Sequence, residues 1–486
     1  MSRIIKQTNP EVTRRTAFRC HERGVRIPTV AQMRDPTRIP AQVAGDLRKV
    51  GLWDVTPLNL FRITWKNDMN TGGFGGVNFL EIPESISGVP APIVGLVGKY
   101  FPTGAHKVGA AFGCLVPRLV SGEFDPAFHK AVWPSTGNFC RGGAFDCALL
   151  GCVPVAVLPE GMSRERFTWL KEIGAEVIAT PGCESNVKEI YDKCHELRRD
   201  PVHMIFNQFE EFGNPIWHYN VTGPALEEVM QSSRFSGRRP AAFISATGSA
   251  GTIAAGDYLK SRFGDLKIVA SEALQCPTLL MNGFGGHRIE GIGDKHVPWV
   301  HNVRNTDAVA AIDDEDCLRI LRLFNEPAGT EYLSLCAIPD DLRHRLPLLG
   351  ISSICNLLAA IKAAKYFDLG PNDVIFTVFT DSVDLYSSRL EELREDLGEY
   401  TLMQAARDHA GPLGHQDIAH FKELGYLERK AIHHLKYYTW VEQQGKTAAE
   451  LQEQWQPEYW KELFEDEVPL FDRMIGEFNQ MAGWKE

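Results

Sequence analysis

The chain contains 486 residues, and its 44% hydrophobic and 23% charged residues are typical of a folded protein with a large apolar core. Acidic residues outnumber basic ones by 62 to 51, which gives a formal net charge of −11, and no basic stripe is visible. This balance argues against a typical nucleic-acid-binding surface, because phosphate backbones are bound by clustered lysine and arginine.

Eleven cysteines are scattered without a C-x-x-C pair or a histidine-rich companion, so the sequence predicts neither a zinc site nor a disulfide framework. An odd cysteine count in a long acidic chain is typical of a reducing cytoplasm. The N-terminus has no apolar stretch of signal-peptide length, and no apolar run is long enough to span a bilayer. We therefore expect a cytoplasmic protein with no bound metal and no membrane or nucleic-acid partner.

Residues 1–94 form the first predicted region, an N-terminal extension. Short segments are punctuated by Pro28, Pro36, Pro40 and Pro57, so we expect an irregular chain up to about residue 95. The glycine-dense run at 72–76 lacks the Lys-Ser/Thr pair of a nucleotide-binding loop, and we interpret it as a turn.

From about Pro90 the pattern alternates between apolar strands and helices, and we assign residues 95–400 to a core of two α/β lobes. Strands are predicted at Ala131–Trp133, Val153–Leu158, Glu176–Ala179, His203–Phe206, Ala241–Ser245, Lys267–Ser271 and Val374–Phe379. Helices are predicted at Arg164–Ile173, Asn186–Arg198, Gly223–Gln231 and Ile253–Phe263. This alternation predicts βαβ units and parallel sheets, in which ligands bind at the carboxyl ends of the strands.

Residues 401–486 are rich in Glu, Gln, His, Trp and Tyr, with aromatic positions at roughly helical spacing. We expect a helical C-terminal extension that serves core packing or an oligomer contact.

Three short motifs carry the chemistry of the core. Lys107 lies among small residues in Thr-Gly-Ala-His-Lys-Val-Gly-Ala-Ala, a setting that suits a buried amine able to form a Schiff base. Ser135–Asn138 follows a predicted strand and offers hydroxyl and amide groups, although the same residues suit a helix N-cap. Gly248–Thr252 follows another strand and opens a helix, as an anion-binding loop or a plain turn would. His106 is interpreted as packing beside the lysine, and nothing nearby marks Cys140 as a nucleophile.

Together these motifs resemble those of the fold-type II pyridoxal phosphate (PLP) enzymes, the group of cysteine synthase, cystathionine β-synthase, threonine synthase and the tryptophan synthase β chain. The lysine segment is similar to that of the tryptophan synthase β chain, and the other two motifs are similar to the substrate-carboxylate and phosphate loops of cysteine synthases. The similarity continues through Gln208–Phe209, Asn214–Pro215, His218, Thr222–Pro224, His287–Gly293 and Gly350–Ser353. It covers roughly residues 95–395.

The resemblance implies an α/β fold of two open, parallel-rich αβα-sandwich domains with pyridoxal 5'-phosphate between them, in a homodimer. It implies Lys107 as the Schiff-base lysine and Asn138 as the partner of the cofactor's phenolic oxygen. The phosphate would be held by Gly248, Ser249, Ala250, Gly251 and Thr252, and the substrate carboxylate by Ser135, Thr136, Gly137 and Gln208. Ser352 would face the pyridine nitrogen, with Asp381 as a rival.

Three departures from the family pattern bear on the substrate. Ser135 stands where the tryptophan synthase β chain carries a glutamate, which disfavours tryptophan synthesis. Phe139 follows Asn138 at the position where cysteine synthases have a small polar residue, and Arg141 comes soon after. We expect both to reshape the substrate pocket.

The resemblance implies β-elimination or β-replacement on a small L-amino acid, such as serine, O-acetylserine or cysteine, through an aminoacrylate. A neutral serine at the ring nitrogen weakens the electron sink, which suits rapid loss of a β-substituent. Threonine or serine dehydration and a threonine synthase-like γ-replacement remain alternatives, since they share the same cofactor site. A non-catalytic regulatory or binding homologue is an alternative of another class.

Overall fold

The computed structural model describes residues 2–135, 137–182, 187–293 and 295–484. Its strands are β1 (Phe79–Ile82), β2 (Ile93–Val97), β3 (Lys130–Pro134), β4 (Val153–Pro159), β5 (Glu176–Thr180), β6 (His203–Ile205), β7 (Arg239–Ala246), β8 (Lys267–Ala273), β9 (Ala308–Ile312), β10 (Asp373–Phe379) and β11 (Phe421–Glu423). Each predicted strand overlaps one of these, which confirms the prediction. The alanine-rich β9 and the strands β1, β2 and β11 were not predicted.

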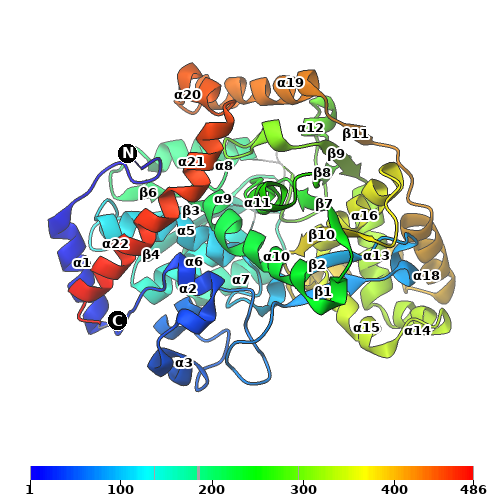
Figure 1. Ribbon diagram of the computed structural model, residues 1–486, viewed down its shortest axis with the longest axis horizontal. Coiled ribbons are helices and arrows are strands. Elements are labelled where there is room, and N and C mark those ends of the chain that lie inside the picture. The colour runs from blue at the N-terminus through cyan, green and yellow to red at the C-terminus, as the bar shows by residue number, and fades with distance from the viewer. Residues whose placement is uncertain (1, 136, 183–186, 294, 485–486) are drawn as a thin grey trace.

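The helices alternate with the strands through the middle of the chain and dominate both ends (Figure 1). They are α1 (Pro10–Glu22), α2 (Val30–Arg34), α3 (Ala41–Leu47), α4 (Glu84–Ser87), α5 (Lys107–Ser121), α6 (Asn138–Leu150), α7 (Arg164–Glu172), α8 (Val187–Leu197), α9 (Gly213–Trp217), α10 (Gly223–Gln231), α11 (Ile253–Phe263), α12 (Thr278–Met281), α13 (Asp314–Asn325), α14 (Pro327–Leu335), α15 (Asp340–Arg345), α16 (Ile351–Tyr366), α17 (Ser387–Leu397), α18 (Leu402–Asp408), α19 (Tyr426–Lys436), α20 (Ala448–Glu453), α21 (Pro457–Glu465) and α22 (Glu467–Met481). The four predicted helices are α7, α8, α10 and α11, although Asn186, at the predicted start of α8, lies outside the described residues.

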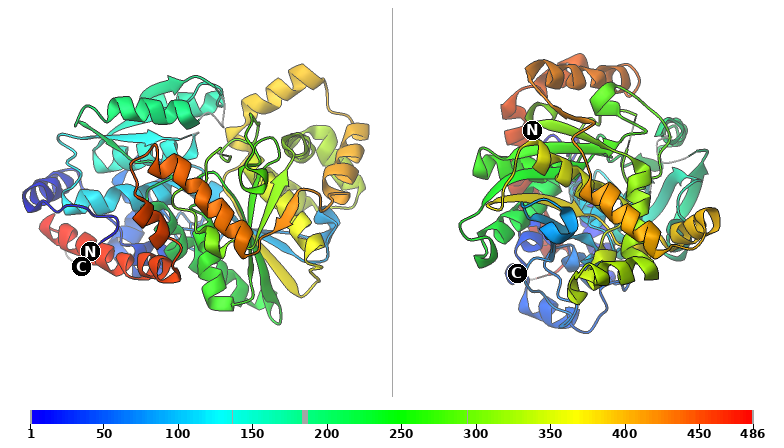
Figure 2. Two further views of the ribbon diagram at one scale, coloured as in Figure 1. Left: turned by 90° about the horizontal axis from the view of Figure 1, so that it is seen from above. Right: turned by 90° about the vertical axis from the view of Figure 1, so that its right-hand side faces the viewer.

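Two sheets organise the molecule, and Figure 2 shows them in neighbouring lobes. The smaller sheet has the order β5-β4-β3-β6 and is parallel throughout. The larger has the order β1-β2-β10-β7-β8-β9-β11, with parallel pairs in its centre and antiparallel strands at both edges. The predicted α/β class with parallel-rich sheets is therefore confirmed.

The N-terminal region departs from the prediction of an irregular chain. Residues 10–22 form the helix α1, because Asn9 caps the backbone N–H of Val12 and Pro10 takes the first helical position, where a missing N–H costs nothing. Ala17 and Cys20 bury one face of this helix. The strand β2 spans the boundary expected between residues 94 and 95, so the large sheet begins within the region assigned to the extension.

The C-terminal part is helical, as predicted, and it lies against the N-terminal region. In Figure 1 the red helices α21 and α22 cross the lobe that contains α1 and α5. Asn479 in α22 exchanges two hydrogen bonds with the backbone of Ile27, at 3.0 and 2.8 Å. Asp472 accepts a 2.6 Å bond from the N–H of Val30. The two ends of the chain thus cover the same side of the core.

Among the described residues, no single helix has the length and apolar character needed to cross a membrane. One bent pair, Asp340–Leu348 with Ile351–Tyr366, meets these criteria by length and composition only. The second member of the pair is α16, which is buried over most of its length.

Candidate active site

Lys107 is the first residue of α5 and follows the loop that leaves β2. Its Nζ lies 3.3 Å from Ser249 Oγ and 3.5 Å from Gln208 Oε1. Burial lowers the pKa of Lys107 to about 8, because the charged ammonium loses hydration. The amine therefore has a substantial neutral fraction near neutral pH, and the neutral amine is the nucleophilic form.

Two buried histidines, His106 and His218, lie close to this lysine. His106 stacks on Trp65, with ring centroids 5.6 Å apart, and meets the edge of His218 at 5.0 Å. Burial and the neighbouring charge of Lys107 hold the pKa of both imidazoles well below the usual range. Buried, neutral rings of this kind serve packing, which agrees with the interpretation that His106 packs beside Lys107.

The Ser135 loop connects β3 to α6, as the sequence predicts. Ser135 Oγ accepts hydrogen bonds from Gln208 Nε2 at 3.1 Å and from the N–H of Gly137 at 3.2 Å. Gly137 has a φ of +148°, and a Cβ there would lie 1.8 Å from Arg166 Nη1. Only glycine fits this position, because a side chain would collide with the guanidinium. Thr136 lies outside the described residues.

Asn138 opens α6 and faces the other lobe. Its Nδ2 donates a 2.6 Å hydrogen bond to Asp381 Oδ2, and its Oδ1 is buried without a partner. Tyr386 donates to the same Asp381 oxygen at 2.9 Å. The amide donor of Asn138 is thus directed at Asp381, and its bond to a phenolic oxygen stays a prediction.

Asp381, the rival for the pyridine nitrogen, lies beside the start of α16. The N–H of Gly350 donates to its carbonyl at 2.9 Å, and a Cβ on Gly350 would lie 2.0 Å from its Oδ1. Asp381 Oδ1 is buried without a hydrogen-bond partner. Ser352 is also buried in the first turn of α16, two residues from Gly350. Both candidates therefore lie near the same helix end.

Gly248–Thr252 connects β7 to α11, as the sequence predicts. In the described part of the chain, the N–H groups of Gly248, Ser249, Ala250 and Thr252 donate to no protein acceptor. Ala250 has a φ of +60°, a strained conformation for a residue with a side chain. Free N–H groups on a small-residue loop that leads into a helix form an anion cradle.

Two residues hold this site together without having been predicted to do so. Asn214 Nδ2 lies 3.0 Å from both Ser249 Oγ and the carbonyl of Gln208, so it joins the phosphate-type loop to the loop of Gln208. Arg166, in α7, donates to Tyr386 Oη at 3.1 Å and pairs with Glu290 at the same distance. Asn214 occurs in a segment whose resemblance we noted, whereas no pattern in the sequence distinguishes Arg166.

These residues fit a pyridoxal phosphate. The chain supplies a buried amine of lowered pKa, a loop with four free N–H groups and a neighbouring pair of hydroxyl and amide side chains. In the described ranges, no cluster of three or more His, Cys, Asp or Glu residues has the geometry to hold a metal ion.

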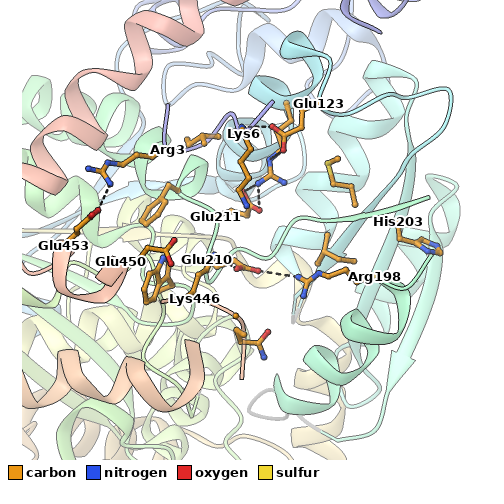
Figure 3. Close-up of a pocket in the computed structure, with 18 of the residues that line it drawn as sticks. Arg3, Lys6, Glu123, Arg198, His203, Glu210, Glu211, Lys446, Glu450 and Glu453 are labelled. Atoms are coloured by element: carbon orange, nitrogen blue, oxygen red, sulfur yellow. Dashed lines mark hydrogen bonds and ion pairs between the residues drawn. The ribbon is translucent and has the colours of Figure 1, made fainter. Parts of the chain in front are cut away.

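A separate cleft of about 710 Å³ lies where the N-terminal segment and the C-terminal tail meet (Figure 3). Its charged groups largely pair with one another: Arg118 with Glu211 and Lys446 with Glu210, each at 2.8 Å. Lys107 does not line this cleft. The candidate reactive site around Lys107 is therefore separate from this cleft.

Comparison with known proteins gives consistent results. The family described as "Pyridoxal-phosphate dependent enzyme" matches residues 99–381. A cysteine synthase of Staphylococcus aureus is 31% identical over 315 residues, which are 65% of this chain and 93% of the relative. A cystathionine beta-synthase of Saccharomyces cerevisiae is 26% identical over 64% of this chain and 59% of its own length.

Solved structures show the same fold. A hydrogen sulfide-producing enzyme complexed with an alpha-aminoacrylate intermediate has a TM-score of 0.55 at 26% identity, over 64% of this chain and 87% of the other. O-Acetyl Serine Sulfhydrylase isoform 3 from Entamoeba histolytica has a TM-score of 0.56 at 23% identity, over 70% of this chain and 94% of the other.

Proposed function

Because this chain belongs to the family of pyridoxal-phosphate dependent enzymes, we propose that it eliminates or replaces the β-substituent of a small L-amino acid. The observation that carries the proposal is the position of Lys107, whose amine lies within 3.5 Å of both Gln208 and Ser249. The resemblance assigns these two residues to the substrate and to the cofactor phosphate, so one amine adjoins both subsites. The relatives named cysteine synthase and cystathionine beta-synthase support this class of reaction.

Each residue of the site has a role in this proposal. Lys107 carries the cofactor and moves the proton of the substrate Cα. Gly248, Ser249, Ala250, Gly251 and Thr252 hold the phosphate, and Ser135, Thr136, Gly137 and Gln208 orient the substrate carboxylate. When bound, the cofactor supplies the electron sink for the pair released at Cα.

The partner of the ring nitrogen decides how strong that sink is. Ser352 is neutral and favours prompt loss of a β-substituent, whereas an ionised Asp381 would favour a longer-lived carbanion. Burial raises the pKa of Asp381, while Arg166, Asn138 and Tyr386 oppose the rise. Asn138, which is bonded to Asp381, would bind the phenolic oxygen of the cofactor.

The catalytic core in this proposal comprises residues 95–400, between an N-terminal extension at 1–94 and a C-terminal extension at 401–486. We also propose a homodimer, with a single amino acid as substrate in each subunit. Light scattering on the purified protein measures the mass in solution, and a mass of one chain would contradict the dimer.

The test of the function is covalent mapping of the cofactor. Reduction of the purified protein with borohydride is expected to leave a pyridoxyl group on the peptide that contains Lys107. Lys107→Ala should lose both this label and turnover, because no other lysine in the described part of the chain is bonded to Ser249 or Gln208. Lys130→Ala is the matched control, since Lys130 pairs with Glu176 on the surface.

Product analysis then separates the reactions. Serine, O-acetylserine and cysteine are expected to give β-elimination or, with an added thiol, β-replacement products. Turnover of threonine or phosphohomoserine alone would favour dehydration or γ-replacement. A protein that takes up no cofactor would contradict the proposal and favour a non-catalytic homologue.

A further inference from the structure

Arg141 is a buried cation that forms no hydrogen bond or ion pair with the residues that the structure describes. It lies in α6, three residues after Asn138, so the two side chains share one face of the helix. Only 6% of the residue is exposed, and its Nε and Nη1 are buried without hydrogen-bond partners. Its guanidinium lies over the ring of Trp169, 4.7 Å from the centroid.

The charged groups around Arg141 compensate it only in part, because Asp381 attracts the guanidinium while Arg166 repels it. The ionisable groups that face it are Arg166, Asp381 and Tyr386. Arg166 already pairs with Glu290, and Asp381 already accepts bonds from Asn138 and Tyr386. In the described part of the chain, no carboxylate forms an ion pair with Arg141.

A buried charge whose N–H groups find no acceptor is expensive, because it has lost its hydration without gaining hydrogen bonds in exchange. Desolvation and the nearby Arg166 lower the pKa of Arg141, but only to about 10, so the guanidinium stays protonated at neutral pH. A positive charge with unsatisfied N–H donors among the described residues therefore lies on the same helix face as Asn138.

The proposed function leaves the β-substituent of the substrate without an assigned partner. The cofactor phosphate belongs to the loop 248–252, and the substrate carboxylate belongs to the loop of Ser135 and to Gln208. Neither loop contains Arg141. What remains is the substituent that distinguishes one amino-acid substrate from another.

We propose that Arg141 selects substrates whose side chain ends in an anionic group, a phosphate, sulfonate or carboxylate. The inference rests on the proposed function and adds to it the class of substrate. The planar guanidinium can bind two oxygens of such a group at once, which favours these ligands over neutral ones of similar size. Recognition of this kind adds no bond-making step to the reaction.

The test compares two unreactive probes that differ in charge. L-2-Amino-3-phosphonopropionate carries an anionic end that cannot leave, and L-2-aminobutyrate has a neutral methyl group in its place. Calorimetry on the cofactor-loaded protein is expected to show at least about tenfold tighter binding of the phosphonate. In Arg141→Leu this preference should disappear. In Arg141→Lys part of it should remain, because lysine keeps the positive charge but cannot bind two oxygens at once as the planar guanidinium does.

Kinetics provide the second readout. The ratio of kcat/KM for O-phospho-L-serine over O-acetyl-L-serine is expected to fall about a hundredfold in Arg141→Leu, the effect of removing a buried charge contact. Arg164→Leu is the matched control, because Arg164 is exposed and pairs with the exposed Glu391. The control should keep the ratio of the unmodified protein.

Equal affinity of the unmodified protein for the two probes would overturn the inference, and so would a preference that survives in Arg141→Leu. If Arg141→Leu lost affinity for both probes equally, the inference would also be overturned, and Arg141 would have a structural role in the site. In all three cases a protein that still binds the cofactor leaves the proposed function intact. Failure to bind the cofactor at all would overturn the proposed function and this inference with it.

Discussion

Asn138 and Asp381 are joined by a 2.6 Å hydrogen bond, although 243 positions separate them in the sequence. Asn138 begins the helix that follows β3 in the four-stranded sheet, and Asp381 follows β10 in the seven-stranded sheet. The bond therefore closes the two lobes over the site between them. Tyr386 donates to the same carboxylate oxygen and strengthens this closure.

Asp381→Asn should change how stability depends on pH. Burial raises the pKa of Asp381 above its value in the unfolded chain, so the folded protein binds a proton more tightly. The stability that this proton contributes is present below the unfolded pKa and is lost as pH rises through the folded pKa. The difference in unfolding free energy, variant minus unmodified protein, should therefore shift in favour of the variant with rising pH. Urea denaturation of the cofactor-free proteins at several pH values measures it, and a constant difference would contradict the expectation.

Lys107 should control the rate of cofactor uptake. Because its pKa is about 8, the neutral fraction of the amine rises about tenfold with each unit of pH until the pH reaches that value. Addition of pyridoxal phosphate to the cofactor-free protein should therefore produce visible absorbance faster as pH rises, with a plateau above pH 8. A rate that keeps rising toward pH 10 would mean that Lys107 titrates like a solvated lysine.

Gly137→Ala should weaken substrate binding in addition to lowering the stability of the fold. The added methyl would lie 1.8 Å from Arg166 Nη1 and would force the Ser135 loop or the guanidinium to move. Gly104→Ala is the matched control, because Gly104 also has a positive φ but nothing within 4 Å of a Cβ. We expect the control to cost about 1 kcal/mol of stability from backbone strain. Gly137→Ala should in addition raise KM sharply, and equal KM values in the two variants would contradict this.

Glu290→Gln should destabilise the protein strongly. Glu290 is nearly inaccessible and pairs with Arg166 at 3.1 Å and with Arg389 at 2.6 Å. Loss of one partner of a buried ion pair costs about 3–5 kcal/mol, because the other charge is left buried alone. Glu391→Gln is the control, since its pair with Arg164 is exposed and contributes about 0–1 kcal/mol. Chemical denaturation measures both values, and similar losses would contradict the distinction.

The sequence predicted the loops of the site better than the contacts between them. Parallel sheets place strand ends at one edge, so the positions of Ser135 and Ser249 followed from the alternation of strands and helices. The role of Arg166 could not be predicted, because its contacts to Glu290 and Tyr386 join segments more than a hundred residues apart. The helix α1 has a local signal in the sequence, because Asn9 and Pro10 form a capping pattern at its start.

The tail also depends on contacts that the sequence does not reveal. Its aromatic spacing predicted helices, but the anchor of α19 is the charged residue Lys436. The Nζ of this fully buried lysine donates to the carbonyls of Trp299 and His301 at 2.9 and 2.7 Å. It also donates to Gln454 Oε1 at 2.8 Å. A single amine thus ties α19 to the segment that follows Val297 and to the end of α20.

Lys436→Met tests this anchor. Methionine has a similar length but no donor, so the carbonyl of Trp299 and Gln454 Oε1 would lose the bond from Lys436, at a cost of about 1–3 kcal/mol for each one that water cannot reach. The carbonyl of His301 would still accept from the N–H of Val303 at 3.0 Å. The apolar side chain offsets part of this, since it removes a buried charge, and we expect a net loss of about 2–4 kcal/mol. Lys461→Met is the control, because Lys461 is exposed in α21. Urea denaturation followed by tryptophan fluorescence measures the change, and a variant as stable as the control would mean that apolar packing alone holds the tail.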